Sequence, residues 1–280
     1  YVPIDPEMPF SYQQHVVLNS QPVLIVTNRL SSIDIGIILG DQMKKKLLFV
    51  EDYQQTILET TENQDISMRI EDPLAYVIYT SGTTGKPNGV CIHNHGLCTL
   101  VDFCQGEFGI GPGFRVLQYA TLSFDAMVFE LFGCLLCGGT LCLSSREEML
   151  PGKPLVETLQ SRKINFICIP PSSLNGLNYA APDLPDLKVL VVGGEKCPVQ
   201  LSQTWSFGRR FYNAYGPTES TVCTLIHLCN GGETNHVPIG KVLPGLNVKL
   251  VDPETGMEST TGELWISGIG VSSVYLHNPS

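Results

Sequence analysis

A short apolar run leads into a loop of glycines and hydroxyl residues between positions 74 and 90, which read Leu74-Ala75-Tyr76-Val77-Ile78-Tyr79-Thr80-Ser81-Gly82-Thr83-Thr84-Gly85-Lys86-Pro87-Asn88-Gly89-Val90. We expect the apolar run to be a buried strand and a second strand to begin at Val90. Glycines let backbone N–H groups converge on one point and hydroxyls add donors, so such a loop can surround phosphate oxygens. It is not a P-loop, because proline follows Gly85-Lys86 and no helix begins there. A plain surface loop between strands is the alternative interpretation.

Short apolar runs alternate with helix-like segments on both sides of this loop. The predicted strands are Val23–Thr27, Leu47–Val50, Leu74–Tyr79, Val90–Ile92, Val116–Ala120, Thr140–Leu143, Phe166–Ile169, Leu187–Val192 and Phe211–Asn213. The predicted helices are Leu97–Cys104, Ala126–Leu136, Lys153–Arg162 and Pro198–Phe207. Continuous hydrophobic strands are typical of sheets buried on both faces. The pattern therefore predicts an α/β fold, in which parallel sheets are flanked by helices.

The predicted domain organisation changes near Pro238. Residues 1–237 form the α/β core, and residues 238–280 begin a small β-rich subdomain in which glycines and prolines separate strands at Lys249–Val251 and Glu263–Ser267. The first and last residues of the chain resemble sequence from inside a domain. We therefore expect the chain to be a fragment that lacks the N-terminal part of its core.

Composition excludes several classes of protein. Of the 280 residues, 43% are hydrophobic and 16% are charged, which is typical of a folded chain. The 17 basic and 27 acidic residues give a formal charge of −10, so general binding to nucleic acid or to an anionic membrane is not expected. No apolar run approaches the ~20 residues of a membrane-spanning helix, and no charged leader opens the chain. These features predict a cytoplasmic protein.

The 10 cysteines are interpreted as small core residues. The one Cys-x-x-Cys pair, Cys134 and Cys137, lies in an apolar run without a matching pair elsewhere. Neither disulfides nor a metal site built from histidine, cysteine and aspartate is predicted from these spacings.

Several further motifs occur along the chain in a recognisable order. They are Tyr1-Val2-Pro3-Ile4-Asp5-Pro6, Ser123-Phe124-Asp125-Ala126, Asn213-Ala214-Tyr215-Gly216-Pro217-Thr218-Glu219 and Gly262-Glu263-Leu264-Trp265-Ile266-Ser267-Gly268. Together with the loop at 80–85, they resemble the signature motifs of the adenylate-forming superfamily, which includes acyl-CoA synthetases, luciferases and the adenylation domains of nonribosomal peptide synthetases. The resemblance spans nearly the whole chain. A strand followed by a Gly-Pro turn is the alternative interpretation of residues 213–219.

The resemblance implies a site for ATP and Mg²⁺. The phosphates would be held by Thr80, Ser81, Gly82, Thr83, Thr84, Gly85 and Lys86. The adenine pocket would be formed by Gly193, Gly194, Glu195, Asn213, Ala214, Tyr215 and Gly216. Thr218 would reach the α-phosphate and Glu219 would bind Mg²⁺, whose hard charge prefers carboxylate oxygen. Thr84, Thr218 and Glu219 are the predicted catalytic residues, since this chemistry depends on positioning and charge neutralisation.

Asp125 indicates which acid is activated. In amino-acid-activating relatives, an aspartate at this place pairs with the substrate α-ammonium, whereas fatty-acid and aryl-acid branches need no such anion. An N-cap for the helix after it is the alternative role, and both roles are compatible. The remaining predicted pocket positions are small or apolar, namely Ala126, Phe129, Cys168, Val191, Gly193, Ala214, Val222 and Cys223. They predict a hydrophobic or aromatic amino acid, although the same residues would suit an ordinary core.

Three departures from the family pattern affect the expected activity. Asn88 stands where relatives carry a lysine that neutralises phosphate, and Lys86 is a candidate substitute. The segment Gly270–Leu276 lacks the usual Ala-Arg-Gly. The chain also ends before the ribose-binding aspartate and the mobile C-terminal domain with its catalytic lysine, so this polypeptide alone is expected to turn over poorly.

The resemblance thus predicts an amino-acid adenylation domain of a modular peptide synthetase. Its partners would be an amino acid, condensation domains, and a carrier protein whose phosphopantetheine thiol accepts the product. An acyl- or aryl-CoA synthetase is one alternative, which Asp125 disfavours. A degenerate, non-catalytic AMP-binding relative is the other, and Asn88 and the altered 271–274 segment favour it.

Overall fold

The computed structural model describes residues 1–29, 46–53, 73–81 and 86–277. The chain divides into two compact units, which are described separately below. The first comprises Tyr1–Cys91 together with Val274–Ser280, and the second comprises Ile92–Ser273. This division follows contacts within the chain, while the predicted boundary at residue 238 stays a prediction.

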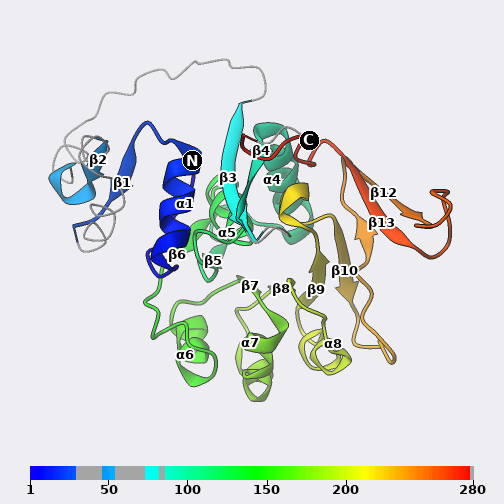
Figure 1. The fold of residues 1–280 in the computed structure, drawn as a ribbon. Helices are drawn as coiled ribbons and strands as arrows, with labels where there is room; N and C mark the ends of the chain where they lie inside the picture. Colours follow the sequence, from blue (N-terminus) through cyan, green and yellow to red (C-terminus); the bar gives the residue numbers. More distant parts are fainter. Residues whose placement is uncertain (30–45, 54–72, 82–85, 278–280) are drawn as a thin grey trace. The chain divides into compact units, whose positions relative to one another are not determined.

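The first unit pairs a helix with two small sheets (Figure 1). Its elements are α1 (Phe10–Ser20), the parallel pair β1 (Ile25–Thr27) and β2 (Leu47–Phe49), and the pair β3 (Leu74–Thr80) and β4 (Asn88–His93). Val16 of α1 packs in one buried cluster with Val77, Tyr79 and Cys91. The backbone N–H of Leu276 donates to the carbonyl of Gly89 at 2.7 Å, so the segment after residue 273 joins this unit.

The second unit is built on a seven-stranded, mostly parallel sheet. Its strand order is β11-β10-β9-β8-β7-β5-β6. The strands are β5 (Arg115–Leu117), β6 (Thr140–Cys142), β7 (Phe166–Ile169), β8 (Val189–Val192), β9 (Arg210–Tyr215), β10 (Leu225–Cys229) and β11 (Lys241–Val242). Strands β5 to β9 are parallel, whereas β10 and β11 are antiparallel to their neighbours. A separate antiparallel pair follows, formed by β12 (Leu246–Val251) and β13 (Glu263–Gly268). The predicted α/β class is confirmed.

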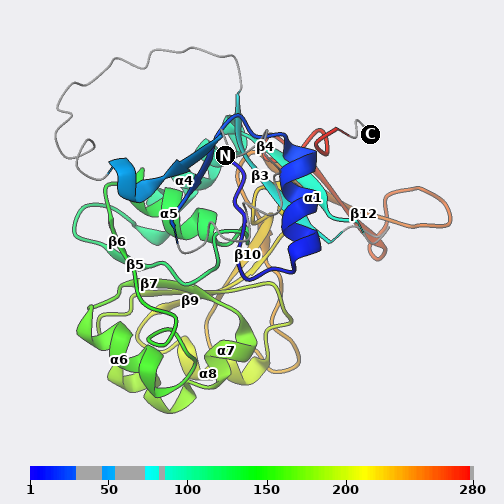
Figure 2. The same ribbon diagram turned by 60° about the vertical axis from the view of Figure 1, so that its left-hand side comes forward.

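Helices cover both faces of this sheet. One face packs against α6 (Lys153–Ser161), α7 (Pro171–Asn175) and α8 (Val199–Trp205), and the other against α4 (Asn94–Phe108) and α5 (Met127–Leu135) (Figures 1 and 2). Side chains alternate across a strand, so β7 sends Ile167 and Ile169 into the α6–α8 core while Phe166 meets Phe108 of α4 at 5.4 Å between ring centroids. The continuous apolar strands of the sequence are thus buried on both sides.

Two features bear on the compositional predictions. All ten cysteines are free, and nine of them are buried. Within the described ranges, none of the helices has the length and apolar character needed to cross a bilayer.

Candidate active site

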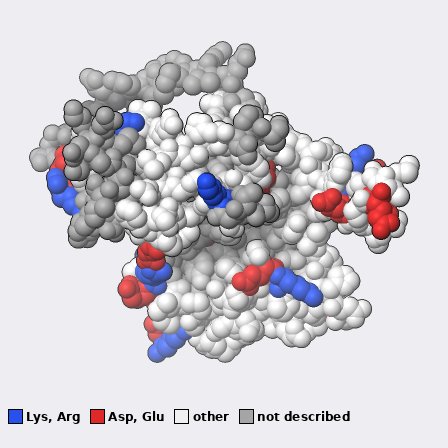
Figure 3. All heavy atoms as spheres, viewed as in Figure 1, with Lys and Arg blue, Asp and Glu red and all other residues white. Residues whose placement is uncertain are grey.

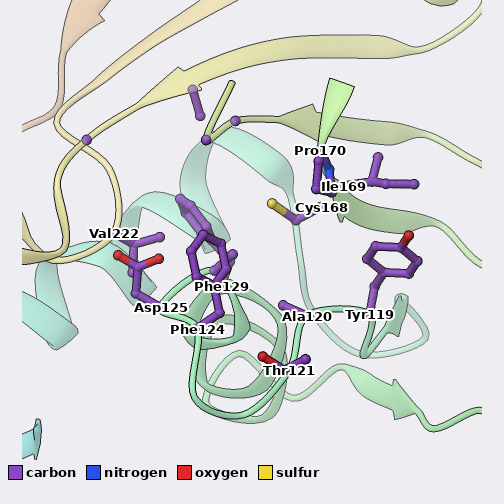
Figure 4. Close-up of a pocket in the computed structure, with 15 residues that line it drawn as sticks. Tyr119, Ala120, Thr121, Phe124, Asp125, Phe129, Cys168, Ile169, Pro170 and Val222 are labelled. Carbon is purple, nitrogen blue, oxygen red and sulfur yellow. The ribbon is translucent and has the colours of Figure 1, made fainter. Parts of the chain in front are cut away.

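A cavity of about 370 Å³ opens in the second unit at the carboxyl ends of β7, β8 and β9 (Figure 4). In parallel α/β sheets this edge is where ligands bind. Its wall is formed by Tyr119, Ala120, Thr121, Phe124, Asp125, Ala126, Phe129, Cys168, Ile169, Pro170, Gly193, Gly194, Ala214, Gly216 and Val222. Among these described residues, Asp125 alone carries a charge. The cavity is therefore an apolar slot with one fixed anion.

The predicted pocket residues fall into two groups. Seven of the nine line the cavity: Asp125, Ala126, Phe129, Cys168, Gly193, Ala214 and Val222. Val191 and Cys223 do not line it and are buried, at 0% and 2% exposure. Val191 is the register partner of Cys168 on the neighbouring strand and shares its face of the sheet, so it supports the floor of the cavity.

The cavity runs between two chemically different ends. Figure 4 shows Asp125 and Val222 at one end and Tyr119 and Ile169 at the other. Phe129 lies between them and is 1% exposed. A ligand that binds Asp125 with a cationic group would therefore extend an apolar portion past aromatic surface.

Asp125 is held by the turn that follows β9. Its Oδ2 accepts a hydrogen bond from Thr218 Oγ1 at 2.6 Å. Burial raises the pKa of Asp125 to about 6, the Thr218 hydrogen bond lowers it, and the nearby charge of Glu219 raises it. The N-cap position of α5 is Ala126, and no side-chain hydrogen bond caps that helix. The alternative N-cap role of Asp125 is therefore not observed, and its carboxylate accepts from Thr218 instead.

The turn at residues 216–224 requires tight backbone geometry. A Cβ on Gly216 would meet Cys223 Cα and the Thr224 nitrogen at 2.7 Å each, so only glycine fits. Val222 has φ 70°, a strained value for a β-branched residue, and it lines the cavity beside Asp125. The turn is fixed by Ser220 Oγ, which lies 2.5 Å from Thr224 Oγ1. This rigid turn places Thr218 and Glu219 close to Asp125.

The residues predicted to contact adenine have varied surroundings. Gly193, Gly194, Ala214 and Gly216 line the cavity, and Tyr215 is 43% exposed. The Asn213 amide donates instead to the Pro238 carbonyl at 2.8 Å. The Glu195 carboxylate accepts from the Ser172 hydroxyl at 2.9 Å. The adenine-binding roles of these residues stay predictions.

The predicted phosphate loop lies in the first unit. Thr80 ends β3, and Ser81 and Lys86 are exposed on either side of the loop. Gly82, Thr83, Thr84 and Gly85 lie outside the described residues. Because Glu219 belongs to the second unit, its pairing with this loop around a triphosphate stays a prediction.

One group of potential metal ligands escaped the sequence analysis. A ring nitrogen of His227, Cys229 Sγ and a Glu233 carboxylate oxygen lie within 4.8 Å of one another. The sequence spacing did not indicate this group, because strand alternation puts His227 and Cys229 on one face and the next loop returns Glu233 to them. Burial would raise the pKa of Glu233, but hydrogen bonds from Ser202, His227 and nearby backbone amides bring it to about 2. These hydrogen bonds occupy the Glu233 carboxylate and indicate that it stabilises the surrounding structure.

A known protein family shares the motifs around this cavity. The family model described as "AMP-binding enzyme" matches residues 1–276. The chain belongs to the AMP-binding enzyme family. The predicted resemblance to adenylation domains of nonribosomal peptide synthetases is also confirmed by its relatives.

Relatives of this AMP-binding chain include several peptide synthetases. A linear gramicidin synthase from Brevibacillus parabrevis is 37% identical over 284 residues, which cover 100% of this chain and 5% of that protein. Bacitracin synthase 3 of Bacillus licheniformis is 35% identical over 289 residues, with 100% and 4% covered. Novobiocin biosynthesis protein H of Streptomyces niveus is 33% identical over 291 residues, with 100% and 47% covered. The chain therefore spans only a small part of the first two of these relatives.

Solved structures agree with this membership. The nonribosomal peptide synthetase FmoA3 in an AMPPNP-bound form has a TM-score of 0.85 and 25% identity, and the match covers 100% of this chain and 30% of that one. A protein containing adenylation and PCP domains, bound to a vinylsulfonamide inhibitor, has a TM-score of 0.82 and 26% identity, with 99% and 48% covered. The AMP-binding fold is thus shared along the chain.

The surface charge of the AMP-binding chain is scattered. Figure 3 shows acidic and basic side chains in small, separate groups on the drawn face, among a majority of uncharged residues. Among the described residues of that face, no broad basic patch of the kind that binds a phosphate backbone is seen.

Proposed function

We propose that this chain activates the carboxylate of an amino acid with ATP, forming an aminoacyl-adenylate that is then loaded onto the phosphopantetheine thiol of a carrier protein. The observation that carries the proposal is the single buried carboxylate of Asp125 at one end of an otherwise apolar cavity. Membership of the AMP-binding family and the peptide synthetases among its relatives support the reaction class.

The reaction needs no side-chain nucleophile. A substrate carboxylate oxygen attacks the α-phosphorus of ATP, the bond to the β-phosphate oxygen breaks, and pyrophosphate leaves. In the second step, the carrier thiol attacks the acyl carbon and AMP leaves. The contribution of the protein is to align the two reactants and to neutralise charge.

Asp125 would select amino acids among carboxylic acids. The residue is 6% exposed, and its carboxylate accepts a hydrogen bond from the Thr218 hydroxyl. A buried anion of this kind is costly unless a cation reaches it, and an α-ammonium group supplies that cation. An acid that lacks the ammonium group would leave Asp125 uncompensated and bind weakly.

The other wall residues would select the side chain. Phe129, Ile169 and Val222 offer apolar surface, and Cys168 adds a thiol at the floor. A charged substrate side chain would find no partner among these described residues. The preferred substrate is therefore a hydrophobic or aromatic amino acid.

The residues present suit Mg²⁺ and a nucleotide. Glu219 supplies a hard carboxylate oxygen on the turn after β9, close enough to Asp125 to raise its pKa. When bound there, Mg²⁺ would neutralise phosphate charge. Thr218, on the same turn, would orient the α-phosphate, and the loop at residues 80–86 would hold the remaining phosphates.

The proposal is tested by ATP–pyrophosphate exchange with the whole protein that carries this chain. Each of the standard amino acids is supplied in turn, and benzoate and hexanoate serve as acids without an ammonium group. We expect exchange with leucine, phenylalanine or a similar apolar amino acid. Exchange that responds to the simple acids, or to aspartate, glutamate, lysine or arginine, would overturn the assignment.

A non-catalytic AMP-binding role is the second candidate. Asn88 begins β4 in the place of the usual lysine, and the nearest lysine, Lys86, is exposed. Binding of ATP without exchange for any amino acid or acid would favour this second candidate. Restoring lysine at position 88 by Asn88→Lys then tests whether the missing charge is the reason.

A further inference from the structure

A second buried carboxyl group lies directly behind the wall of the cavity. Glu130 of α5 is 0% exposed and does not line the cavity. Its Oε2 accepts hydrogen bonds from the backbone N–H groups of Tyr119 and Ala120, both at 3.0 Å. Tyr119 and Ala120 themselves line the cavity. The carboxyl group of Glu130 therefore contacts the cavity wall through the backbone of Tyr119 and Ala120.

These bonds fix one end of the loop that builds the wall. Residues 118–126 connect β5 to α5 and contribute Tyr119, Ala120, Thr121, Phe124, Asp125 and Ala126 to the cavity. The other end is fixed by the first turn of α5, where the Val128 N–H donates to the Asp125 carbonyl at 2.8 Å. Glu130 reaches back from that same helix to the start of the loop. The loop is thus tied to α5 at both ends, with Asp125 between the ties.

Stability alone gives little reason for a carboxyl group at this place. Burial raises the pKa of Glu130 to about 8, although the amides of Ala120 and Tyr119 lower it. In the described part of the chain, no lysine, arginine or histidine forms an ion pair with it. What a carboxyl group does provide is an oxygen that accepts from two adjacent N–H groups, which would otherwise be buried without partners.

We propose that Glu130 is a positioning residue that sets the shape of the substrate pocket, because it holds the 118–126 loop against α5 and so fixes the place of Asp125. The part of the proposal that concerns substrate affinity rests on the proposed function. The part that concerns the order of the loop does not.

The test compares two substitutions of similar volume in the whole protein. Glu130→Met keeps the packing and removes the acceptor, whereas Glu130→Gln keeps one acceptor oxygen. Glu148→Ala is the control, since this partly exposed glutamate also accepts a backbone N–H, from Ser145 at 2.8 Å, in a different loop. Hydrogen exchange of peptides that cover residues 118–126 is measured for each protein, together with the KM values for leucine or phenylalanine and for ATP.

We expect Glu130→Met to speed amide exchange in the 118–126 peptides by about tenfold and to raise the amino-acid KM by about tenfold, as the loss of the acceptor implies. The KM for ATP and the exchange of peptides from β8 and β9 should stay within about twofold of the wild-type values, since the hydrogen bonds of Glu130 go to the start of the 118–126 loop. Glu130→Gln should speed exchange at Ala120, which meets both oxygens, more than at Tyr119, which meets one. Glu148→Ala should change none of these values.

Several results would count against the proposal or against one of its two parts. Wild-type exchange at residues 118–126 in Glu130→Met would show that the carboxyl group does not hold the loop. Equally faster exchange throughout the second unit in Glu130→Met would show a merely structural role. If Glu130→Met does not fold, unchanged exchange at Ala120 in Glu130→Gln would decide against the proposal. Faster loop exchange with an unchanged amino-acid KM would separate loop order from substrate binding. If the wild type activates no amino acid, the proposed function fails while the exchange measurements still judge the loop.

Discussion

Replacement of Asp125 by asparagine should make the protein more stable and at the same time remove its preference for amino acids. The two effects have one cause. Burial of the Asp125 carboxylate costs free energy, and the α-ammonium group of the proposed amino-acid substrate would compensate its charge. Asparagine keeps the shape of the side chain and can still accept from Thr218, but it has no charge to desolvate.

The size of the stability effect follows from the pKa of Asp125. Burial raises it to about 6 from an ordinary 3.8, and one pKa unit corresponds to about 1.4 kcal/mol. The folded state therefore binds the proton more tightly than the unfolded state. The resulting penalty is absent below pH 4, develops as the pH rises from about 4 to 6, and reaches about 3 kcal/mol at pH 7 to 8. Asp125→Asn removes it.

The assay is urea unfolding of the wild type and Asp125→Asn between pH 4.5 and 8. We expect the asparagine variant to be more stable at pH 8, by up to about 3 kcal/mol, and the difference to shrink toward pH 4.5. The amino-acid KM of the same variant should rise by about 30-fold or more, because a buried charge pair is lost. Asp102→Asn, an exposed aspartate on α4, is the matched control and should change neither property.

The reasoning is refuted if Asp125→Asn is less stable than the wild type at pH 8, or if the stability difference does not depend on pH. An unchanged amino-acid KM would refute the functional half separately. In that case the carboxylate would be buried for a reason other than substrate binding.

Three further predictions concern other parts of the second unit. Cys168→Phe should fill the floor of the cavity and raise the KM for a large apolar amino acid by about tenfold or more. The KM for glycine or alanine should stay the same. An unchanged KM for the large amino acid would contradict this prediction. Glu219→Gln should raise the Mg²⁺ concentration needed for half-maximal exchange by about tenfold, and an unchanged magnesium titration would remove Glu219 from the metal site. Trp205→Ala should lower the free energy of unfolding by about 3–5 kcal/mol, because Trp205 is fully buried and its Nε1 donates to Asn178 at 2.8 Å. A loss below about 1 kcal/mol would contradict the place of Trp205 in the core.

The strands of the sheet were predictable because burial on both faces leaves a clear pattern. Phe166–Ile169 is a strand over the predicted residues, and every other predicted strand overlaps an observed one. Val116–Ala120 was predicted too long at its end, because β5 stops at Leu117. Tyr119 and Ala120 leave the sheet to form the wall of the cavity, and Glu130 accepts hydrogen bonds from their backbone N–H groups.

Elements with a weak pattern were missed. Helix α1 has no continuous apolar face, and it buries a few residues such as Val16 and Val17 among polar ones. Strand β10 is a short apolar run that His227 interrupts, and it follows a turn in which Thr221 and Val222 adopt positive φ. Composition alone does not predict such a turn. Local sequence carries little information about such tertiary arrangements.

Site residues that belong to a sequence motif could be predicted. Residues that reach the site only through tertiary contacts could not. Asp125 and Phe129 were predicted from the resemblance and line the cavity. Tyr119 and Thr121 were missed because they line the cavity only as a result of the path that the loop between β5 and α5 takes. Glu130 was missed because a glutamate in a helix normally suggests exposure, and only its place behind the wall shows otherwise.

The central claim is that Asp125 makes this AMP-binding chain specific for amino acids, and mass spectrometry of the adenylates tests it most directly. The whole protein is incubated with ATP, Mg²⁺ and a mixture of apolar amino acids and the corresponding acids without an amino group, and Asp125→Ala is treated in the same way. The account predicts aminoacyl-adenylate from the wild type and a marked loss of it in the variant. Acyl-adenylates of the simple acids as the main wild-type product, or an aminoacyl-adenylate yield that does not change in Asp125→Ala, would contradict it.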